Sequence, residues 1–397
     1  MSYRPSNRRP SYGRARYPRA NSSNRRGPSK ENIHPSRFVK AASMVAAEIY
    51  APTHAFSELN INRLLKANLE SNDIRVPSPI QDQTIPQALA GRDIVGIADT
   101  GTGKTLAFAV PVLQKLLSRQ AAKALILAPT RELAQQINEQ FRRTAAGSGL
   151  RSVVLIGGAP MYPQLRDLKA GAHIVIGTPG RIKDHLERKS LNLSTFDVVV
   201  LDEVDRMLDM GFVPDVRRIL GQLKLQRQSF FFSATLDKRV GDLIREFSRD
   251  PLTVSIKTGD TVDSVEQNIV SYNTHRDKIE KLHDLLISGQ GFKALVFDDT
   301  QRGVQRLSDE LQSRGFKVDA IHGGKSQGQR QRALRRFKTN EISVLVATDV
   351  AARGIDVPDI THVINYSTPS SYNDYVHRIG RTGRAGQQGQ ALTFIAA

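Results

Sequence analysis

The chain has 397 residues, 39% of them hydrophobic, and a formal net charge of +18 at pH 7. A chain of this length folds into two or three domains of roughly 100–200 residues each. It contains no cysteine, which excludes disulfide bonds and thiolate metal sites and agrees with a reducing compartment. The positive charge indicates a polyanionic partner, most commonly nucleic acid.

The first 52 residues are expected to form a disordered tail. Residues 1–40 contain eleven Lys and Arg against one acid, Glu31, among many Pro, Ser, Asn and Tyr, so they cannot bury enough apolar surface to fold alone. The tyrosines suit stacking on unpaired bases while the arginines bind phosphate, and a solubilising tail without a ligand explains the composition equally well. The stretch "HPSRFVKAASMVAAEIY" indicates one additional short helix.

No part of the sequence is predicted to enter a membrane, because apolar runs such as "VVVL" and "ALILA" are too short to span a bilayer. The Arg-rich N-terminus is superficially similar to an organelle transit peptide. However, Pro5, Pro10, Pro18 and Pro28 would interrupt an amphipathic helix there, and no secretory apolar segment follows. We therefore expect a cytoplasmic protein.

From Phe56 onward, short continuous apolar runs such as "DIVGIA", "KALILAP" and "DVVVLDE" alternate with helical stretches. Continuous apolar strands separated by helices are typical of a parallel sheet that is covered on both faces. The alternation restarts with "KALVFDD" and "SVLVATD" in the last third of the chain. We predict two α/β domains with parallel sheets, residues 53–257 and residues 258–397.

The stretch "ADTGTGKT", Ala98 to Thr105, is the strongest local signal for chemistry. It follows a predicted strand and precedes a predicted helix, which is the context of a phosphate-binding loop. Gly101 and Gly103 allow close approach of the backbone to phosphates. Lys104 suits the β- and γ-phosphates and the Thr105 hydroxyl suits Mg²⁺.

The strand "VVVL" runs directly into Asp202, Glu203 and Asp205. Alone, such a cluster is more often a solvated acidic turn than a site. In a sequence that also contains a phosphate loop, a functional site is the favoured interpretation, because phosphoryl transfer needs an acidic site that holds Mg²⁺ and orients water. Asp202 then suits the Mg²⁺ role, usually through water, and Glu203 suits activation of the attacking water.

At this point the sequence resembles the DEAD-box ATP-dependent RNA helicases of superfamily 2, most closely bacterial members, over residues 56–397. The resemblance rests on ordered motifs: "VPSPIQ" (76–81), "ADTGTGKT", "PTRELA" (129–134), Gly157–Gly158, "TPGR" (178–181), "DEVD" (202–205), "SAT" (233–235), "ATDVAARGID" (347–356) and "HRIGRTGR" (377–384). It implies two RecA-like domains with ATP and single-stranded RNA bound in the cleft between them.

The nucleotide-binding residues that the resemblance implies are Phe56, Gln81, Thr100, Gly101, Thr102, Gly103, Lys104, Thr105 and Asp356. Gln81 would contact the adenine edge through its amide and so select ATP. Phe56 would stack on the base, and Asp356 would reach the ribose. The cofactors are therefore expected to be ATP and Mg²⁺, with the metal held by Thr105 and Asp202, partly through water.

The catalytic residues that the resemblance implies are Lys104, Asp202, Glu203, His377, Arg381 and Arg384. Arg381 and Arg384 would reach the γ-phosphate from the second domain as arginine fingers, which contribute roughly 10³–10⁵ in rate in related hydrolases. The residues that the resemblance implies for coupling of nucleotide state to domain closure are Ser233, Thr235, Asp205 and Arg378. His377 and Arg378 would organise the interface between the domains.

The RNA-binding residues that the resemblance implies are Arg131, Gly158, Thr178, Arg181, Gln327, Arg330 and Thr348. Glycine amides, threonine hydroxyls and arginines bind phosphate and 2′-OH groups rather than base edges, so RNA binding should be sequence-tolerant. For any one of these residues an ordinary surface role explains the sequence as well.

We expect an RNA-stimulated ATPase that locally unwinds short duplexes and remodels RNA or RNA–protein complexes, acting as a monomer. An ATP-gated RNA clamp or annealing factor has the same motifs and stays open. A DNA-translocating motor is disfavoured by Gln81 and Asp205.

Three departures from the family pattern stand out. Val204 replaces the Ala of the family name, and we expect it to fill an apolar slot behind the acids. Asp73-Ile74 replaces the usual Gly and aromatic pair. The printed sequence ends directly after "ALTFI", without the terminal helix that such domains often have, so we expect a slightly less stable second domain.

Overall fold

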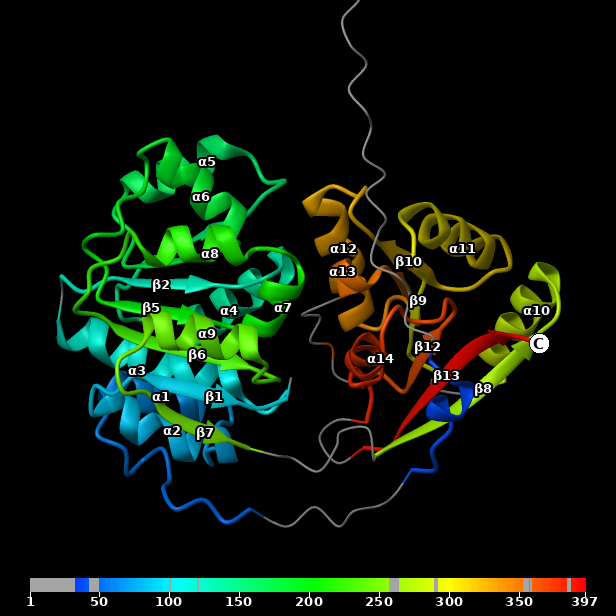
Figure 1. Ribbon diagram of the computed structural model, residues 1–397, viewed down its shortest axis with the longest axis horizontal. Coiled ribbons are helices and arrows are strands. Elements are labelled where there is room, and N and C mark those ends of the chain that lie inside the picture. Colours follow the sequence, from blue (N-terminus) through cyan, green and yellow to red (C-terminus); the bar gives the residue numbers. More distant parts are fainter. Residues whose placement is uncertain are drawn as a thin grey trace, which may run out of the picture.

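The computed structural model describes residues 33–42, 50–99, 101–119, 121–256, 264–288, 292–352, 357, 359–383 and 387–397. Figure 1 shows two α/β domains side by side, with α7 of the first domain facing α12 and α13 of the second. The predicted fold class, two domains with parallel sheets, is confirmed. Among the helices in the described parts of the chain, none combines the length and the hydropathy that a transmembrane span requires.

The first domain contains a parallel sheet of seven strands in the order β3-β4-β2-β5-β6-β1-β7. Its strands are β1 (Ile94–Ile97), β2 (Ala124–Leu127), β3 (Ser152–Leu155), β4 (Ile174–Gly177), β5 (Val198–Leu201), β6 (Gln228–Ser233) and β7 (Leu252–Ser255). Its helices are α1 (Arg63–Ser71), α2 (Pro79–Leu89), α3 (Lys104–Ser118), α4 (Arg131–Thr144), α5 (Met161–Lys169), α6 (Pro179–Glu187), α7 (Val204–Asp209), α8 (Val213–Leu220) and α9 (Lys238–Phe247).

The second domain contains a parallel sheet of six strands in the order β10-β11-β9-β12-β13-β8. Its strands are β8 (Val265–Tyr272), β9 (Ala294–Phe297), β10 (Val318–Ile321), β11 (Val344–Ala347), β12 (His362–Asn365) and β13 (Gly389–Ala396). Its helices are α10 (His275–Ile287), α11 (Gln301–Ser313), α12 (Gln327–Lys338), α13 (Asp349–Ala352) and α14 (Tyr372–Ile379).

Each sheet separates two hydrophobic clusters, which explains the continuous apolar strands in the sequence. In β5, Val199 packs in one cluster of the first domain and its neighbour Val200 packs in the other. In β9 the neighbours Leu295 and Val296 are divided between the two clusters of the second domain in the same way. Successive strand residues point to opposite faces, so a sheet covered by helices on both faces requires apolar residues at every position.

Three adjacent strands of the first sheet deliver the predicted chemistry to one edge. β5, β6 and β1 are neighbours, and they end at the acidic box, at Ser233 and at the phosphate loop, respectively. The amide of Ala98 donates to the carbonyl of Ser233 at a distance of 3.0 Å, so the pairing of β1 with β6 continues into the loop. Sites at the carboxyl ends of parallel strands are the rule in open α/β sheets.

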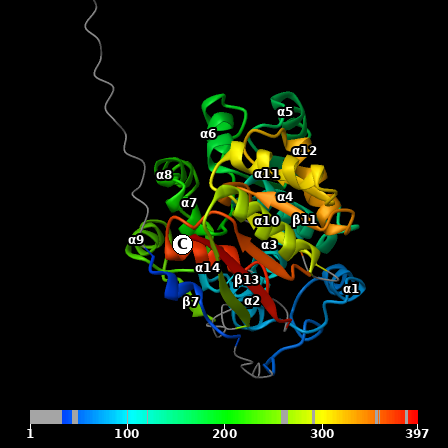
Figure 2. The ribbon, with the colours of Figure 1, turned by 90° about the vertical axis from the view of Figure 1, so that its right-hand side faces the viewer.

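Part of the segment that the sequence indicates as a tail is folded onto the second domain. Residues Pro35–Phe38 form the 3₁₀-helix η1, which lies against β8 and α14 (Figure 1 and Figure 2). The segment has too few apolar residues to fold alone, but the buried side chain of Phe38 has its apolar partners in the second domain. Residues 1–32 lie outside the described residues.

Candidate nucleotide and RNA sites between the domains

The phosphate loop has the geometry that its glycines predict. Gly101 and Gly103 have φ angles of 91° and 93°, a backbone region that is costly for residues with a Cβ. Gly103 is the residue before α3, and the buried Lys104 begins this helix and donates from Nζ to the carbonyl of Ala98 at 2.8 Å. Thr100 lies outside the described residues. The loop therefore leads into the N-terminus of a 15-residue helix, where free N–H groups favour phosphate.

Gln81 is joined directly to the phosphate loop. Its Nε2 donates to the carbonyl of Gly103 at 2.9 Å, and its Oε1 accepts from the backbone N–H of Ser78 at 2.9 Å. Ser78 in turn donates from Oγ to the carbonyl of Thr102 at 2.7 Å. The amide of Gln81 retains one N–H and one lone pair for a ligand. Ser78 and Gln81 therefore fix Thr102 and Gly103 of the phosphate loop. No role for Ser78 was expected from the sequence.

Phe56 packs in the core of the first domain with 3% of its surface exposed. Its stacking on a base stays a prediction, as does the ribose contact of Asp356, which lies outside the described residues. The structure therefore places Gln81 beside the phosphate loop and gives no corresponding contact for these two.

The acidic box is buried at the end of β5. Asp202 and Glu203 are 3% and 4% exposed, and the N–H of Glu203 donates to Oδ1 of Asp202 at 3.0 Å. Glu203 adopts a left-handed backbone with φ 53° and ψ 55°, immediately before α7. Such a conformation costs on the order of 1–3 kcal/mol and persists where the surrounding fold imposes it. The strained turn directs two acids to the edge of the sheet beside the phosphate loop.

Burial raises the pKa of Asp202 to about 7, opposed by the positive charge of Lys104 and reinforced by Glu203 and Asp205. A buried carboxylate among other acids favours the proton unless a cation compensates. Asp202 is therefore a carboxyl group whose ionisation depends on what binds next to it.

Asp205 joins the acidic box to the "SAT" motif. Its Oδ2 accepts from the N–H groups of Ala234 and Thr235 at 3.1 and 3.0 Å and from the Thr235 hydroxyl at 3.2 Å. Its own N–H donates to Oγ of Ser233 at 3.3 Å. These contacts connect the end of β6 to α7.

Two further residues of this turn are buried. Val204 is 0% exposed and packs in a hydrophobic cluster of the first domain, which places it in the apolar slot that the sequence predicted. Arg206, which the sequence analysis did not single out, lies with Nε 3.5 Å from Oε2 of Glu203. Both are almost fully buried, so the arginine supplies the counter-charge of the candidate base.

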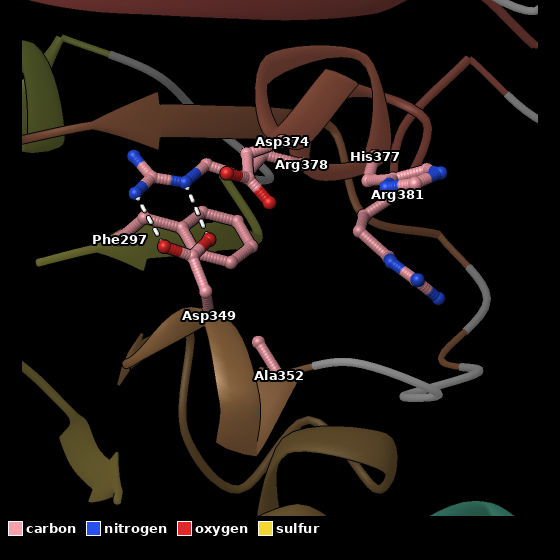
Figure 3. Close-up of a pocket in the computed structure, with 7 residues that line it drawn as sticks. All are labelled: Phe297, Asp349, Ala352, Asp374, His377, Arg378 and Arg381. Carbon is pink, nitrogen blue, oxygen red and sulfur yellow. Dashed lines mark hydrogen bonds and ion pairs between the residues drawn. The ribbon is translucent and has the colours of Figure 1, made fainter. Parts of the chain in front are cut away.

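The arginine-rich motif of the second domain divides into two groups. Figure 3 shows Arg378 turned toward Asp349, and Arg381 turned away from that pair beside His377. Arg378 donates from Nε and Nη2 to the two carboxylate oxygens of Asp349, both at 2.6 Å, and from Nη1 to the carbonyl of Ser367 at 2.7 Å. Arg384 lies outside the described residues.

The position of Arg378 differs from the one expected of an interface residue. Its side chain is 1% exposed and stacks over Phe297, with the guanidinium carbon 5.1 Å from the ring centroid. It fixes α13, which begins at Asp349, inside the second domain. A buried guanidinium needs carboxylate and carbonyl partners, and the second domain itself provides them.

A groove between the domains brings together most of the predicted RNA-binding residues. Residues of the first domain that line it include Arg131, Gly157, Thr178 and Arg181, and residues of the second include Gly323, Arg330 and Val350. Gly158 has φ 73° and lies against Arg131, whose Nη1 would be 2.0 Å from any Cβ there. Thr348 lies between β11 and α13 and is not among the lining residues.

Two predicted RNA-binding residues of the second domain bind the first domain instead of lying open. Nη2 of Arg330 lies 2.8 Å from Oε2 of Glu132, and Nε2 of Gln327 donates to Oε1 of Gln135 at 3.2 Å. Glu132 is buried in α4 and was not assigned a role from the sequence. Glu132 directly follows Arg131 in the "PTRELA" motif, and this position is the sequence feature that could have indicated a functional role for it.

Comparisons with known proteins agree with this geometry. Residues 78–243 match the family model of DEAD/DEAH box helicases, and residues 277–386 match that of the helicase conserved C-terminal domain. The chain is 43% identical, over 343 residues, to the DEAD-box ATP-dependent RNA helicase CshA of Streptococcus pneumoniae. That match covers 86% of this chain and 65% of the curated relative, so the chain spans about two thirds of its length.

Solved structures show the same two-domain fold. A DEAD box protein from the hyperthermophile Methanococcus jannaschii is 39% identical, with a TM-score of 0.51 and coverage of 86% of this chain and 93% of that one. Dbp5 of S. cerevisiae bound to RNA and ADP BeF3 is 29% identical, with a TM-score of 0.77 and coverage of 86% and 90%. A whole-chain score depends on domain placement as well as on domain fold, so the two domains are arranged much as in RNA-bound Dbp5.

Proposed function

Because the chain belongs to the DEAD-box helicase family, whose fold of two RecA-like domains it shares, we propose that it is an RNA-stimulated ATPase that unwinds short RNA duplexes and remodels RNA or RNA–protein complexes. The observation that supports this most is the groove between the domains, to which each domain contributes arginine. RNA in this groove would contact both domains at once, with its phosphates beside Arg131 and Arg181 of the first domain, and so favour the closed arrangement.

ATP binds at the phosphate loop, with its phosphates at the N-terminus of α3 and Lys104 against the β- and γ-phosphates. Gln81 contacts the adenine edge, and its bond to the carbonyl of Gly103 at 2.9 Å connects base recognition to the loop. Glu203 accepts the proton of the attacking water. Arg381 and Arg384 stabilise the charge that develops on the γ-phosphate, which requires the second domain to lie against the first.

Thr105 and Asp202 fit a Mg²⁺ site of the kind that is completed by nucleotide and water. Both provide oxygen ligands, and no group of three or more His, Asp or Glu side chains suited to a metal occurs in the described part of the chain. Mg²⁺ usually takes one or two protein ligands and keeps water and substrate phosphates as the others. When bound, the ion neutralises charge on the β- and γ-phosphates. Its charge also compensates the carboxylate of Asp202.

Asp205 couples the nucleotide site to closure of the two domains, because it joins Ser233 and Thr235 to the acidic box. ATP and RNA together close the cleft and bend one RNA strand, which separates a short duplex. Hydrolysis and phosphate release reopen the cleft. We further propose a monomeric, cytoplasmic protein that binds RNA without sequence preference and acts on ribonucleoprotein partners.

The test is Glu203→Gln. We expect this variant to lose RNA-stimulated ATP turnover while it still binds ATP, measured by phosphate release and by equilibrium binding of a fluorescent ATP analogue. Turnover at the wild-type rate would contradict the assignment of Glu203 and with it the proposed mechanism.

An ATP-gated RNA clamp or annealing factor is the second candidate, because binding across both domains does not itself require strand separation. A strand-displacement assay on a short duplex, with ATP or with a non-hydrolysable analogue, distinguishes the two functions. Displacement with ATP supports the helicase, and stable binding without displacement supports the clamp. ATPase activity stimulated equally by DNA would indicate a DNA motor.

A further inference from the structure

The segment before the first domain is anchored on the second domain. Phe38 is 0% exposed, and its ring meets Tyr375 of α14 edge-on with a centroid distance of 4.7 Å. Ile33 belongs to the same hydrophobic cluster of the second domain. The guanidinium of Arg37 lies 3.6 Å from the ring centroid of Tyr372. Burial of a phenylalanine and an isoleucine against a folded domain stabilises the contact well beyond what a surface ion pair provides.

Backbone pairing extends this anchor. Lys40 donates from its N–H to the carbonyl of Gln267 at 3.0 Å, and Gln267 donates back to the carbonyl of Lys40 at 2.8 Å. Gln267 lies in β8, the edge strand of the second sheet, and its side-chain Oε1 accepts from the hydroxyl of Tyr375 at 2.9 Å. The segment therefore covers a sheet edge that would otherwise offer unpaired backbone groups.

A second anchor fixes the same segment to the first domain. Asp82 in α2 accepts from the Tyr50 hydroxyl at 2.5 Å, from the N–H of Thr53 at 2.8 Å, and from the N–H and Nδ1 of His54 at 3.1 and 2.8 Å. Burial opposes the charge of this carboxylate, but these hydrogen bonds hold the pKa of Asp82 below its ordinary value. Asp82 directly follows Gln81, so the second anchor adjoins the residue proposed to contact adenine.

Chain length makes the two anchors a constraint on the domains. Ala42 and Tyr50 are eight residues apart in the chain, which allows a span of at most about 28 Å. Ile256 and Ser264, which flank the direct covalent connection between the two domains, are also eight residues apart in the chain. The domains are thus joined at two places by connections of equal length, and both anchors are formed in the arrangement that resembles RNA-bound Dbp5.

We propose that the two anchored segments, residues 33–42 and residues 50–54, act as an N-terminal tether that limits the separation of the two domains and favours closure of the cleft. Two connections keep the domains at a higher effective concentration than one. The tether connects the surface around Tyr375 to Asp82, which directly follows Gln81. The effect on closure with ATP and RNA rests on the proposed function, whereas the restraint on the free protein does not.

The absence of natural cysteine allows two dyes to be placed cleanly. Leu225→Cys in the first domain and Ile287→Cys in the second replace side chains that are 83% and 63% exposed. Single-molecule energy transfer between them measures the separation of the domains. In this background we compare Phe38→Ala, which removes the first anchor, with Val39→Ala, whose side chain is 52% exposed, as the matched control. Lys40→Pro removes the backbone donor to Gln267 and is an independent second variant.

Without RNA or nucleotide, Phe38→Ala and Lys40→Pro should shift the distribution of energy transfer to lower values and broaden it, and Val39→Ala should not. With a non-hydrolysable ATP analogue, the RNA concentration for half-maximal closure should rise by about three- to tenfold in both anchor variants. Distributions identical to that of Val39→Ala would overturn the tether. A shifted distribution in a protein without RNA-stimulated ATPase would support the tether and contradict only the proposed function.

Discussion

Arg330 of the second domain and Glu132 of the first form a buried ion pair across the cleft, with 2.8 Å between Nη2 and Oε2. Their side chains are 8% and 3% exposed. The pair holds α12 against α4 and lines the groove proposed for RNA. It therefore stabilises the contact between the domains and the shape of the RNA groove together.

Removal of either partner should weaken RNA binding more than removal of both. Glu132→Gln and Arg330→Gln each leave one buried charged group without its partner, which costs about 3–5 kcal/mol in the closed arrangement. We expect the RNA concentration for half-maximal ATPase to rise at least tenfold in each single variant, with strong non-additivity in the double variant. Glu139→Gln, on the same helix and 57% exposed in an ion pair with Arg143, is the control. Additive effects would show that the two residues act separately.

Gly103→Ala should abolish nucleotide binding, whereas Gly91→Ala should not. Both glycines have positive φ, 93° and 90°, so alanine introduces similar backbone strain at each. A Cβ at Gly103 would lie 2.4 Å from Nε2 of Gln81, but nothing lies within 4 Å of a Cβ at Gly91. Equilibrium binding of a fluorescent ATP analogue and thermal unfolding of both variants would test this. Equal loss of binding would indicate strain alone.

Binding of Mg²⁺-nucleotide should release a proton near neutral pH. The pKa of Asp202 is raised to about 7 in the free protein, and a metal ligand must be ionised. Affinity should therefore increase as the pH rises from about 6 to about 8 and then level off. Calorimetry in buffers of different ionisation enthalpy measures the released proton. The same titration without Mg²⁺ should release none, and equal release in both would assign the proton to another group.

The raised pKa of Asp202 also determines how the free energy of unfolding changes with pH. The folded protein binds this proton more tightly than the unfolded chain does. The contribution of Asp202 to the free energy of unfolding is therefore present below the ordinary pKa of an aspartate and is lost as the pH rises through about 7.

Val204→Ala should reduce stability and leave chemistry intact. The side chain is 0% exposed and packs in the cluster below the acidic box, so loss of its two methyl groups should lower the free energy of unfolding by about 1–2 kcal/mol. The hydrogen bonds of Asp202 and Asp205 in this turn involve other atoms. We expect kcat within twofold of the wild type and a lower thermal midpoint. A large change in kcat would show that this position tunes the site.

Local patterns in the sequence were sufficient to predict where the strands, the phosphate loop and the acidic box lie along the chain. A run such as "VVVL" is buried on both faces of a sheet whatever its partners are, and the conformation of Gly103 follows from the loop itself. The order of strands then brings the box, the "SAT" motif and the phosphate loop to one edge. These features depend on residues that are close in sequence or on general rules of parallel sheets.

The tertiary structure decided which polar groups pair over long separations. Arg378 could have faced the cleft, but Asp349 and the carbonyl of Ser367 hold it inside the second domain. Glu132 and Arg330 are almost 200 residues apart, and their pairing depends on the placement of whole domains. Phe38 lies in a segment with too few apolar residues to fold alone. It is buried because Tyr375 and Val265, more than 200 residues away, form the surface that receives it, and no local pattern specifies such a partner.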